Sequence, residues 1–282
     1  MDRWLIFFTE RFPLINSAVL VSGISLSGLY LSSSPPFSFL AFMLSFIGIV
    51  FVLALLCLME DVKNLEKDRI AHSKRPLPKG VIKKSEAIFV IKAMEIILFI
   101  YGLILWMLLG YSAAMSYLVV AAYFWLLNKN FGIKDWLSRR PLVYGFLYHL
   151  IFIFLAVFAI EIRPVPLLSS VVWSFALLLY GAFFCYDICS KLNPHAHPVL
   201  GTYIHFYGYH FVFNLAAICL AISAIGAIGL GLAFILIPCE LVVLAALSAV
   251  YFQPALFRLA QMVAGLSLVL HAWAVALNAA FF

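Results

Sequence analysis

Nine long apolar runs follow one another along this chain of 282 residues, and they constrain its fold more than any other feature. A helix needs about 20 apolar residues to cross the hydrocarbon core of a bilayer. Charged residues make up only 11% of the chain, whereas a soluble domain carries about 25%, so charges cannot cover its surface. We therefore predict an all-α, polytopic membrane protein whose spans are residues 14–33, 37–58, 87–109, 112–128, 143–160, 165–186, 206–229, 231–252 and 262–281.

The distribution of lysine and arginine predicts the orientation of these spans. When the loops are assigned alternately to the two sides, all of the 18 Lys and Arg residues except Arg163 fall on or near the side of the N-terminus. Cytoplasmic loops carry the excess of such residues. We therefore expect a cytoplasmic N-terminus and a C-terminus on the opposite side of an inner or cytoplasmic membrane. The net charge of +6 then follows from topology, and it does not indicate a nucleic-acid partner.

The loops on the two sides also differ in length. Those expected outside are very short, whereas the cytoplasmic loops after the second, fourth and sixth spans are long and polar. Any polar chemistry of the chain therefore has room only on the cytoplasmic face.

The loop after the second span begins with an acidic stretch, EDVKNLEKD (residues 60–68), and continues as RIAHSKRPLPKG (69–80). If the helix of the span extends through the acidic stretch, a rotation of about 100° per residue gathers an acidic face made of Glu60, Asp61, Asn64, Lys67 and Asp68. Three acids on one face repel one another unless a cation lies among them, and hard divalent cations take such oxygen ligands. The following basic residues could bind phosphate oxygens. The alternative is a solvated loop of mixed charge.

A second polar stretch, DICSKLNPHAHPVLGTYIHFYG (residues 187–208), follows the sixth span. Asp187 and Lys191 are spaced i, i+4, so on a helix they share a face and can pair. His195 and His197 lie beyond the break expected at Pro194. Imidazole suits Zn, Fe or Mn better than Mg²⁺. The histidines could therefore bind such a metal, donate hydrogen bonds, transfer a proton or have no role.

The first stretch resembles the aspartate-rich signature of the UbiA-type intramembrane prenyltransferase superfamily, roughly N-D-x-x-D-x-x-x-D followed by a basic stretch and R-P-L/I-P-x-G. Glu60 stands where the family usually has Asn, and Asn64 where it has Asp. The residues that match are Asp61, Asp68, Arg69, Arg75 and the RPLPKG tail. The second stretch is similar to the family's second acidic motif at Asp187, Ile188, Lys191, Thr202, Tyr203 and Gly208, but His195 and His197 replace acids and Ser190 replaces an arginine.

The resemblance implies one UbiA-like transmembrane domain over residues 1–282, with its helices around a central cavity open to the cytoplasmic side. It implies a prenyl diphosphate substrate, surrounding membrane lipids and Mg²⁺, with Mn²⁺ as an alternative cofactor. The residues that it implies for catalysis are Asp61, Asp68, Asp187 and Tyr203. Those that it implies for the metal are Glu60, Asp61, Asn64, Asp68 and Asp187. For diphosphate binding, the expected residues are Asn64, Lys67, Arg69, Arg75, Lys134, Lys191, His195 and His197.

Three functions are compatible with this pattern. The first is transfer of the prenyl group to a lipid-soluble or aromatic acceptor after the diphosphate leaves. The second is terpene cyclisation, in which the chain's own double bond captures the carbocation and no second substrate is needed. The third belongs to another class, a transporter or a non-catalytic isoprenoid-binding protein. Transport is disfavoured because the charges gather at one membrane face, away from the midplane where transporters bind their substrates.

Several ionisable or polar residues lie inside the predicted spans, namely Glu95, His149, Asn214, Glu240, His271 and Asn278. An ionisable group is costly inside a membrane, so each of these marks either a functional site or an interhelical hydrogen bond.

Overall fold

A computed structural model describes residues 3–32, 37–167 and 169–281 of the chain. Within these residues nine helical segments are long and apolar enough to cross a membrane, and no strand occurs. The chain is therefore an all-α integral membrane protein, as predicted. The spanning helices are α2 (Leu14–Leu31), α3 (Phe39–Ala71), α4 (Lys84–Leu109), α5 (Tyr111–Asn128), α7 (Pro141–Glu161), α8 (Ser170–Ser190), α9 (Tyr203–Gly229), α10 (Ala233–Phe252) and α11 (Phe257–Phe281).

Short helices occupy the connections at one end of this bundle. They are α1 (Arg3–Arg11), η1 (Asn130–Gly132), α6 (Lys134–Ser138), η2 (Pro198–Leu200) and η3 (Pro254–Leu256). Residue 33, the last of the first predicted span, and residue 168, inside the sixth, lie outside the described residues.

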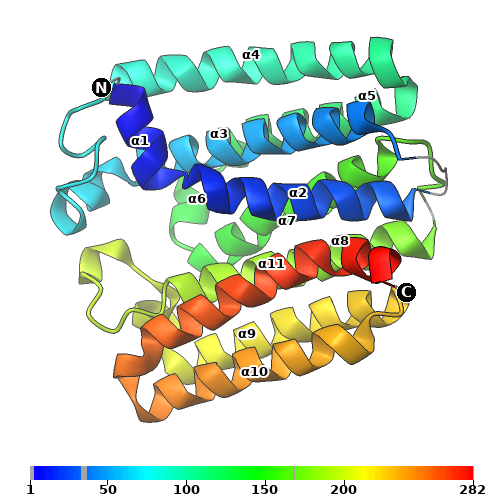
Figure 1. The fold of residues 1–282 in the computed structure, drawn as a ribbon. Coiled ribbons are helices and arrows are strands. Elements are labelled where there is room, and N and C mark those ends of the chain that lie inside the picture. The colour runs from blue at the N-terminus through cyan, green and yellow to red at the C-terminus, as the bar shows by residue number, and fades with distance from the viewer. Residues whose placement is uncertain (1–2, 33–36, 168, 282) are drawn as a thin grey trace.

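The spanning helices form a closed ring. Each packs against the next one along the chain, and α11 closes the ring against α2 (Figure 1). Contacts between α2 and α7 and between α8 and α11 join the two halves of the ring across its middle. The helix α1 and the end of α11 lie at opposite ends of the bundle, as an odd number of spans requires.

Small residues let α2 approach its neighbours closely. A Cβ on Gly28 would overlap the backbone of Ala159 on α7, and the Oγ of Ser27 donates to the carbonyl of Ala272 on α11 at 2.7 Å. Close backbone approach of this kind is the usual way in which membrane helices associate. The long polar loops lie at the end of the bundle that carries α1, which we call the α1 end. The bundle is tightly packed away from that end.

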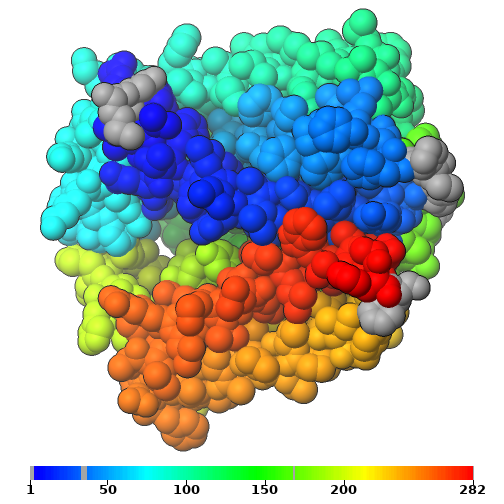
Figure 2. All heavy atoms as spheres, in the orientation of Figure 1, coloured from blue at the N-terminus to red at the C-terminus, as the bar shows by residue number. Residues whose placement is uncertain are grey.

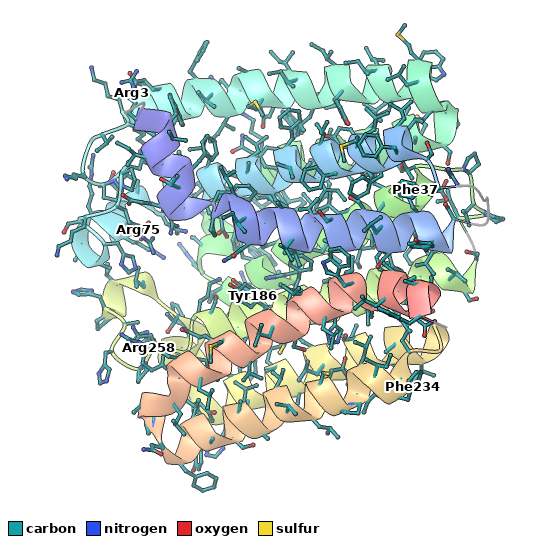
Figure 3. All side chains as sticks on the ribbon, viewed as in Figure 1. Arg3, Phe37, Arg75, Tyr186, Phe234 and Arg258 are labelled. Atoms are coloured by element: carbon teal, nitrogen blue, oxygen red, sulfur yellow. The ribbon has the colours of Figure 1, made fainter. Side chains whose placement is uncertain are left out.

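The basic residues gather at the α1 end. Figure 3 shows Arg3, Arg75 and Arg258 there, whereas Phe37 and Phe234 lie at the opposite end. This is the one-sided distribution from which the topology was predicted. Which end faces the cytoplasm stays a prediction.

Helix α3 is much longer than a span needs. It has 33 residues, which at 1.5 Å per residue is about 50 Å, and it continues 13 residues beyond the predicted end at 58. The acidic stretch is therefore helical, so its members Glu60, Asp61, Asn64, Lys67 and Asp68 share one face of α3. The helix ends where the backbone N–H of His72 bonds to the carbonyl of Asp68, a few residues before Pro76.

Helix α9 begins with a separate turn. Gly208 has φ 76° and ψ 168° inside α9, a conformation that glycine adopts readily and other residues do not. The residues from Tyr203 to Tyr207 therefore form their own helical turn at the α1 end, and the continuous helix of this span begins after Gly208, whereas the predicted span begins at residue 206.

Candidate active site

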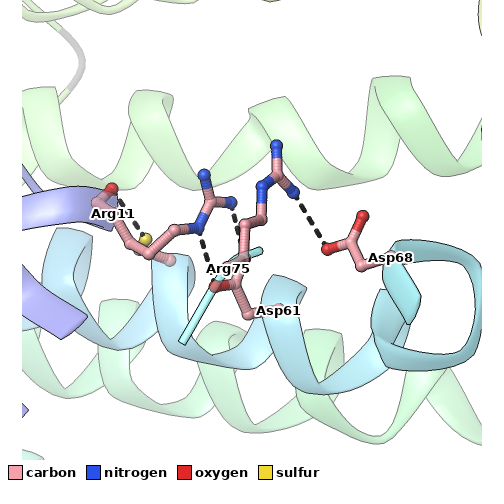
Figure 4. Close-up of polar contacts among 5 residues, drawn as sticks. Arg11, Asp61, Asp68 and Arg75 are labelled. Carbon is pink, nitrogen blue, oxygen red and sulfur yellow. Dashed lines mark hydrogen bonds and ion pairs between the residues drawn. The ribbon is translucent and has the colours of Figure 1, made fainter. Parts of the chain in front are cut away.

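Asp61 lies on the acidic face of α3 and is held by an arginine from α1. Its side chain is 3% exposed. Arg11 donates from Nε to Oδ2 at 2.8 Å and from Nη2 to Oδ1 at 2.6 Å (Figure 4). This hydrogen-bonded carboxylate also raises the pKa of Arg11. A bidentate pair of this kind is among the strongest polar contacts in proteins, so both oxygens of Asp61 are engaged within the protein.

The sequence reasoning missed Arg11. It counted this residue only as one more positive charge on the cytoplasmic side. The only signal in the sequence is a basic residue placed just before Pro13, where the chain enters its first span. Nothing in that signal points to a partner 50 residues away.

Asp68, two turns further along α3, has its own arginine. Nη1 of Arg75 donates to Oδ2 of Asp68 at 2.9 Å (Figure 4). Arg75 reaches it because the loop after α3 turns back, with the N–H of Val81 bonded to the carbonyl of Pro76 at 2.9 Å. Partial burial, and then the positive charge of Arg75, lower the pKa of His72, which follows the end of α3.

Helix α8 carries the opposite wall of the candidate site. Nζ of Lys191 donates to Oδ2 of Asp187 at 2.7 Å, so the predicted i, i+4 pair is confirmed. The side chain of Lys191 is 44% exposed. Its partial desolvation opposes the charged form, but the carboxylates of Asp187 and Glu60 outweigh this effect and raise the pKa of Lys191. Glu60 of α3 therefore lies close enough to Lys191 for the two charges to interact.

Helix α7 supplies aromatic side chains and a histidine to the same region. Nε2 of His149 lies 3.8 Å from Oδ2 of Asp187, and its Nδ1 is hydrogen-bonded to the carbonyl of Gly145 at 2.7 Å. The imidazole ring is stacked on Phe184, with centroids 4.2 Å apart. The ring is thus fixed in orientation beside Asp187. Of the intramembrane polar residues singled out in the sequence, His149 is the one that the fold brings to this site.

Tyr203, a predicted catalytic residue, is fixed by its neighbours on α7 and α8. Gly145 leaves room for its hydroxyl group, because a Cβ at that position would overlap it. Nζ of Lys191 lies 5.7 Å from the centroid of the Tyr203 ring. Tyr203 is therefore part of the α8 wall.

The remaining predicted residues lie at the surface of the α1 end. Arg69 is exposed and paired with the exposed Glu66 at 3.0 Å, and Lys134 is exposed on α6. Both loop histidines are exposed, and their loop folds on itself, since Nδ1 of His197 accepts from the N–H of Val199. The turn η2 in this loop packs against α3. The other exposed members of the predicted set are Asn64, Lys67 and Lys191.

Lys63 has a different role from Lys67, the other lysine of the acidic stretch. Its Nζ donates to the carbonyl of Leu127 at 2.6 Å and to Oδ1 of Asn130 at 2.8 Å. It therefore caps the end of α5 and ties that end to α3. This contact fixes the start of the loop that contains Lys134.

The surface between the two polar stretches is hollowed. Figure 2 shows the hollow between the cyan loop after α3 and the yellow-green loop after α8, beside the start of α2. The acidic end of α3 and the end of α8 lead into these loops.

Carboxylate and amide oxygens at the α1 end fit a hard cation by their chemistry. Glu60, Asn64 and Asp68 follow one another at i, i+4 and i+8 along α3, and Glu60 and Asp187 both lie near Lys191. Among the described residues, however, no three His, Cys, Asp or Glu side chains are close enough to form a metal site by themselves. Asn64 or oxygens of a bound substrate would have to complete the coordination.

Two other intramembrane acids are engaged between helices. Oε1 of Glu95 on α4 accepts from Asn128 of α5 at 2.8 Å. Glu240 of α10 lies 3.1 Å from His271 of α11, and both side chains are buried. For these residues the interhelical interpretation of the sequence is confirmed.

Comparison with known proteins gives two matches. The sequence model of the UbiA prenyltransferase family matches residues 21–263. A solved structure described as digeranylgeranylglyceryl phosphate synthase in membranes has a TM-score of 0.60 to this chain and is 18% identical, over 97% of this chain and 100% of its own. No curated protein matches the chain. At 18% identity the structural match establishes a shared fold.

Proposed function

Because the chain belongs to the UbiA prenyltransferase family, we propose that it ionises a prenyl diphosphate at the α1 end of the bundle and transfers the prenyl group to a membrane-soluble acceptor. The observation that carries this proposal is the Asp187–Lys191 pair at 2.7 Å, together with the electrostatic effect of Glu60 on Lys191. A cation held in place by carboxylates next to an apolar helix bundle is suited to a substrate with a charged head and an apolar tail.

The basic residues of the site have distinct roles in this proposal. Lys191 and Arg75 are each oriented by a carboxylate, at 2.7 Å and 2.9 Å. Preorganised donors stabilise the negative charge that develops on a leaving group, so these two bind the diphosphate while the allylic C–O bond breaks. The exposed residues of the same end attract and bind the diphosphate at the mouth of the site, namely Asn64, Lys67, Arg69, Lys134, His195 and His197.

Mg²⁺, or Mn²⁺ in its place, would be held by oxygen atoms of Glu60, Asn64, Asp68 and Asp187. Bound there, it would neutralise charge on the leaving diphosphate. Asp61 does not belong to this set, because both of its oxygens accept hydrogen bonds from Arg11. The role of Asp61 in this proposal is to hold the acidic face of α3 in position through its ion pair with Arg11.

Terpene cyclisation is the second candidate, and one observation favours it. Aromatic rings gather beside Asp187, where Tyr144, Tyr148 and His149 follow one another on α7, with ring centroids 6.2 Å and 5.2 Å apart. Aromatic faces stabilise cations and would guide a carbocation through ring closure.

The experiment that tests the proposal uses purified protein and radiolabelled prenyl diphosphates of graded chain length. Diphosphate release and labelled lipids are measured with and without Mg²⁺, and with and without a membrane-lipid extract as acceptor. Release that requires the extract and yields a prenylated lipid supports transfer. Release without the extract, yielding a cyclic hydrocarbon, supports cyclisation. Binding without release of diphosphate contradicts both and supports a non-catalytic or transport function.

A matched pair of variants links the activity to the site. Lys191→Gln removes the cation between α3 and α8 and should abolish release. Arg163→Gln removes a cation at the other end of the bundle, between α7 and α8, and should leave release unchanged. Equal activity in the two variants would contradict the placement of the reaction at the α1 end.

A further inference from the structure

The helix α1 is a separate element that lies against the α1 end without crossing the bundle. It has only nine residues, RWLIFFTER, and the chain breaks before α2, where Pro13 has extended backbone angles. Phe7 is completely buried, whereas Leu5 is 45% exposed. Helix α1 therefore has one face docked on the bundle and another facing outward.

Three contacts dock α1 on two different spans. Its Phe7 belongs to the apolar core. The thiol of Cys57 on α3 donates to the carbonyl of Arg11 at 3.2 Å. At the other end of α1, Nη1 of Arg3 lies 3.1 Å from Oε1 of Glu86 on α4. The docking thus covers the place where α3 and α4 reach the α1 end.

The fourth contact is the one that concerns the reaction. Arg11 is the last residue of α1, and its guanidinium holds both oxygens of the buried Asp61. A buried carboxylate that loses its partner is strongly destabilised, so Asp61 cannot keep its position without α1. Glu60 and Asp68 are on the same helix face as Asp61, one residue before it and two turns after it. A shift of Asp61 would therefore also move this face of α3, although Asp68 is held by Arg75 as well.

We propose that α1 is a positioning element of the active site, in which Arg11 fixes Asp61 and thereby the acidic face of α3. The inference rests on the proposed function, because it concerns turnover of the same substrate. Arg11 acts through Asp61 and is a positioning residue. Docking of α1 then decides whether the protein is active, although α1 is not one of the spanning helices.

The first test is a set of variants at the ion pair. Arg11→Gln should lower kcat by about 10²-fold, the typical effect of losing one preorganised charge contact. It should also raise the Mg²⁺ concentration for half-activity, because Glu60 and Asp68 lie on the same face of α3 as Asp61, while KM for the prenyl diphosphate stays unchanged. Arg11→Lys should restore part of kcat. Arg11→Gln with Asp61→Asn should be no worse than Arg11→Gln alone, because both remove the same contact. Arg3→Gln removes the contact to Glu86 only and is the control for the charge of α1.

The second test measures docking without any substrate. Cys57 lies under α1, so its alkylation by a maleimide reports whether α1 is in place. In a chain whose other cysteines (Cys185, Cys189, Cys219 and Cys239) are replaced by alanine, Phe7→Ala should speed the alkylation of Cys57 and lower kcat. For Arg11→Gln, the fold decrease in kcat should be larger than the fold increase in the rate of Cys57 alkylation.

The outcomes separate the inference from the function on which it rests. Wild-type kcat in Arg11→Gln, or in Phe7→Ala with Cys57 readily alkylated, would overturn the positioning role. If Phe7→Ala does not fold, the comparison of Arg11→Gln with Arg3→Gln still decides. If the unaltered protein releases no diphosphate from any substrate, the proposed function fails, and with it the positioning role, whereas the alkylation of Cys57 still reports the docking of α1.

Discussion

Arg75 reaches back seven residues along the chain and donates from Nη1 to Oδ2 of Asp68 at 2.9 Å. Asp68 is the last residue of the acidic face of α3, and Arg75 belongs to the RPLPKG loop that follows. The pair thus joins the two halves of the first motif into one unit, because the loop must fold back for the arginine to reach the helix. It also leaves Nε and Nη2 of Arg75 as donors for a substrate anion.

The first prediction concerns this pair. Asp68→Asn and Arg75→Gln should each lower turnover by about 10²–10³-fold, because each removes a preorganised charge from the site. The double variant should lose less than the product of the two effects, since the residues act as one unit. Diphosphate release measures turnover. The control is Glu66→Gln on the same helix, whose exposed ion pair is worth at most about 1 kcal/mol. Independent, multiplying effects would contradict the coupling.

The second prediction is a pH dependence. Asp187 and Glu60 raise the pKa of Lys191 above its ordinary value, against the effect of burial. A raised pKa keeps Lys191 protonated as the pH rises, so KM for the prenyl diphosphate should stay constant from pH 7 to about 10, the ordinary range of lysine titration. In Asp187→Asn one of the two carboxylates that raise the pKa of Lys191 is lost, so that pKa falls and KM should rise within that range. Parallel KM profiles for the two proteins would show that Asp187 does not set the charge of Lys191.

The third prediction concerns the fit between α7 and α9. Gly145→Ala places a Cβ where the hydroxyl of Tyr203 lies, and such overpacking costs about 1–3 kcal/mol of unfolding free energy. Tyr203→Phe removes the hydroxyl, so it should restore much of the stability lost in Gly145→Ala. Thermal unfolding in detergent measures the effect.

A matched glycine on α11 serves as the control. A Cβ on Gly265 would meet Tyr186 at 3.5 Å, an ordinary contact. Gly265→Ala should therefore raise stability slightly, by up to about 1 kcal/mol of helix propensity. Equal losses of stability at Gly145 and Gly265 would argue against the specific overlap with Tyr203.

The fourth prediction separates stability from activity. Glu240→Ala and His271→Ala should each lower the stability of the bundle by about 1–2 kcal/mol, the scale of an interhelical hydrogen bond in a membrane. Neither should change KM or kcat at a temperature where the protein is folded, because the pair joins α10 to α11 and none of the described contacts links it to the Asp187–Lys191 pair. A large loss of kcat in a fully folded variant would show that the pair belongs to the reaction.

The fifth prediction concerns topology. A cysteine introduced at Lys79 should react with a membrane-impermeant maleimide only after cells are permeabilised, because the loop after α3 is expected on the cytoplasmic side. A cysteine at Arg163, at the opposite end, should react in intact cells. Labelling of both positions from the same side would contradict the alternation of the nine spans, and the reverse labelling would contradict the orientation.

The features that depend on residues close together in the chain could be predicted from the amino-acid sequence alone. The nine spans follow from the length of apolar runs, because a bilayer demands about 20 apolar residues wherever a helix crosses it. The acidic face of α3 and the Asp187–Lys191 pair follow from helical periodicity, which links only residues three or four positions apart. The motif resemblance rested on the same local stretches, and the match of the family over residues 21–263 agrees with it.

Only the tertiary structure decided which partners these residues have across the bundle. Arg11 binds Asp61 over 50 positions, His149 lies beside Asp187, and Lys63 caps a distant helix. Glu95 and Glu240 are no different in sequence from a catalytic acid, yet they pair with neighbouring helices. Such contacts depend on how helices rotate and approach one another, which small residues such as Gly28 and Gly145 permit at particular points. No local pattern records that arrangement, because it is a property of the packed ring.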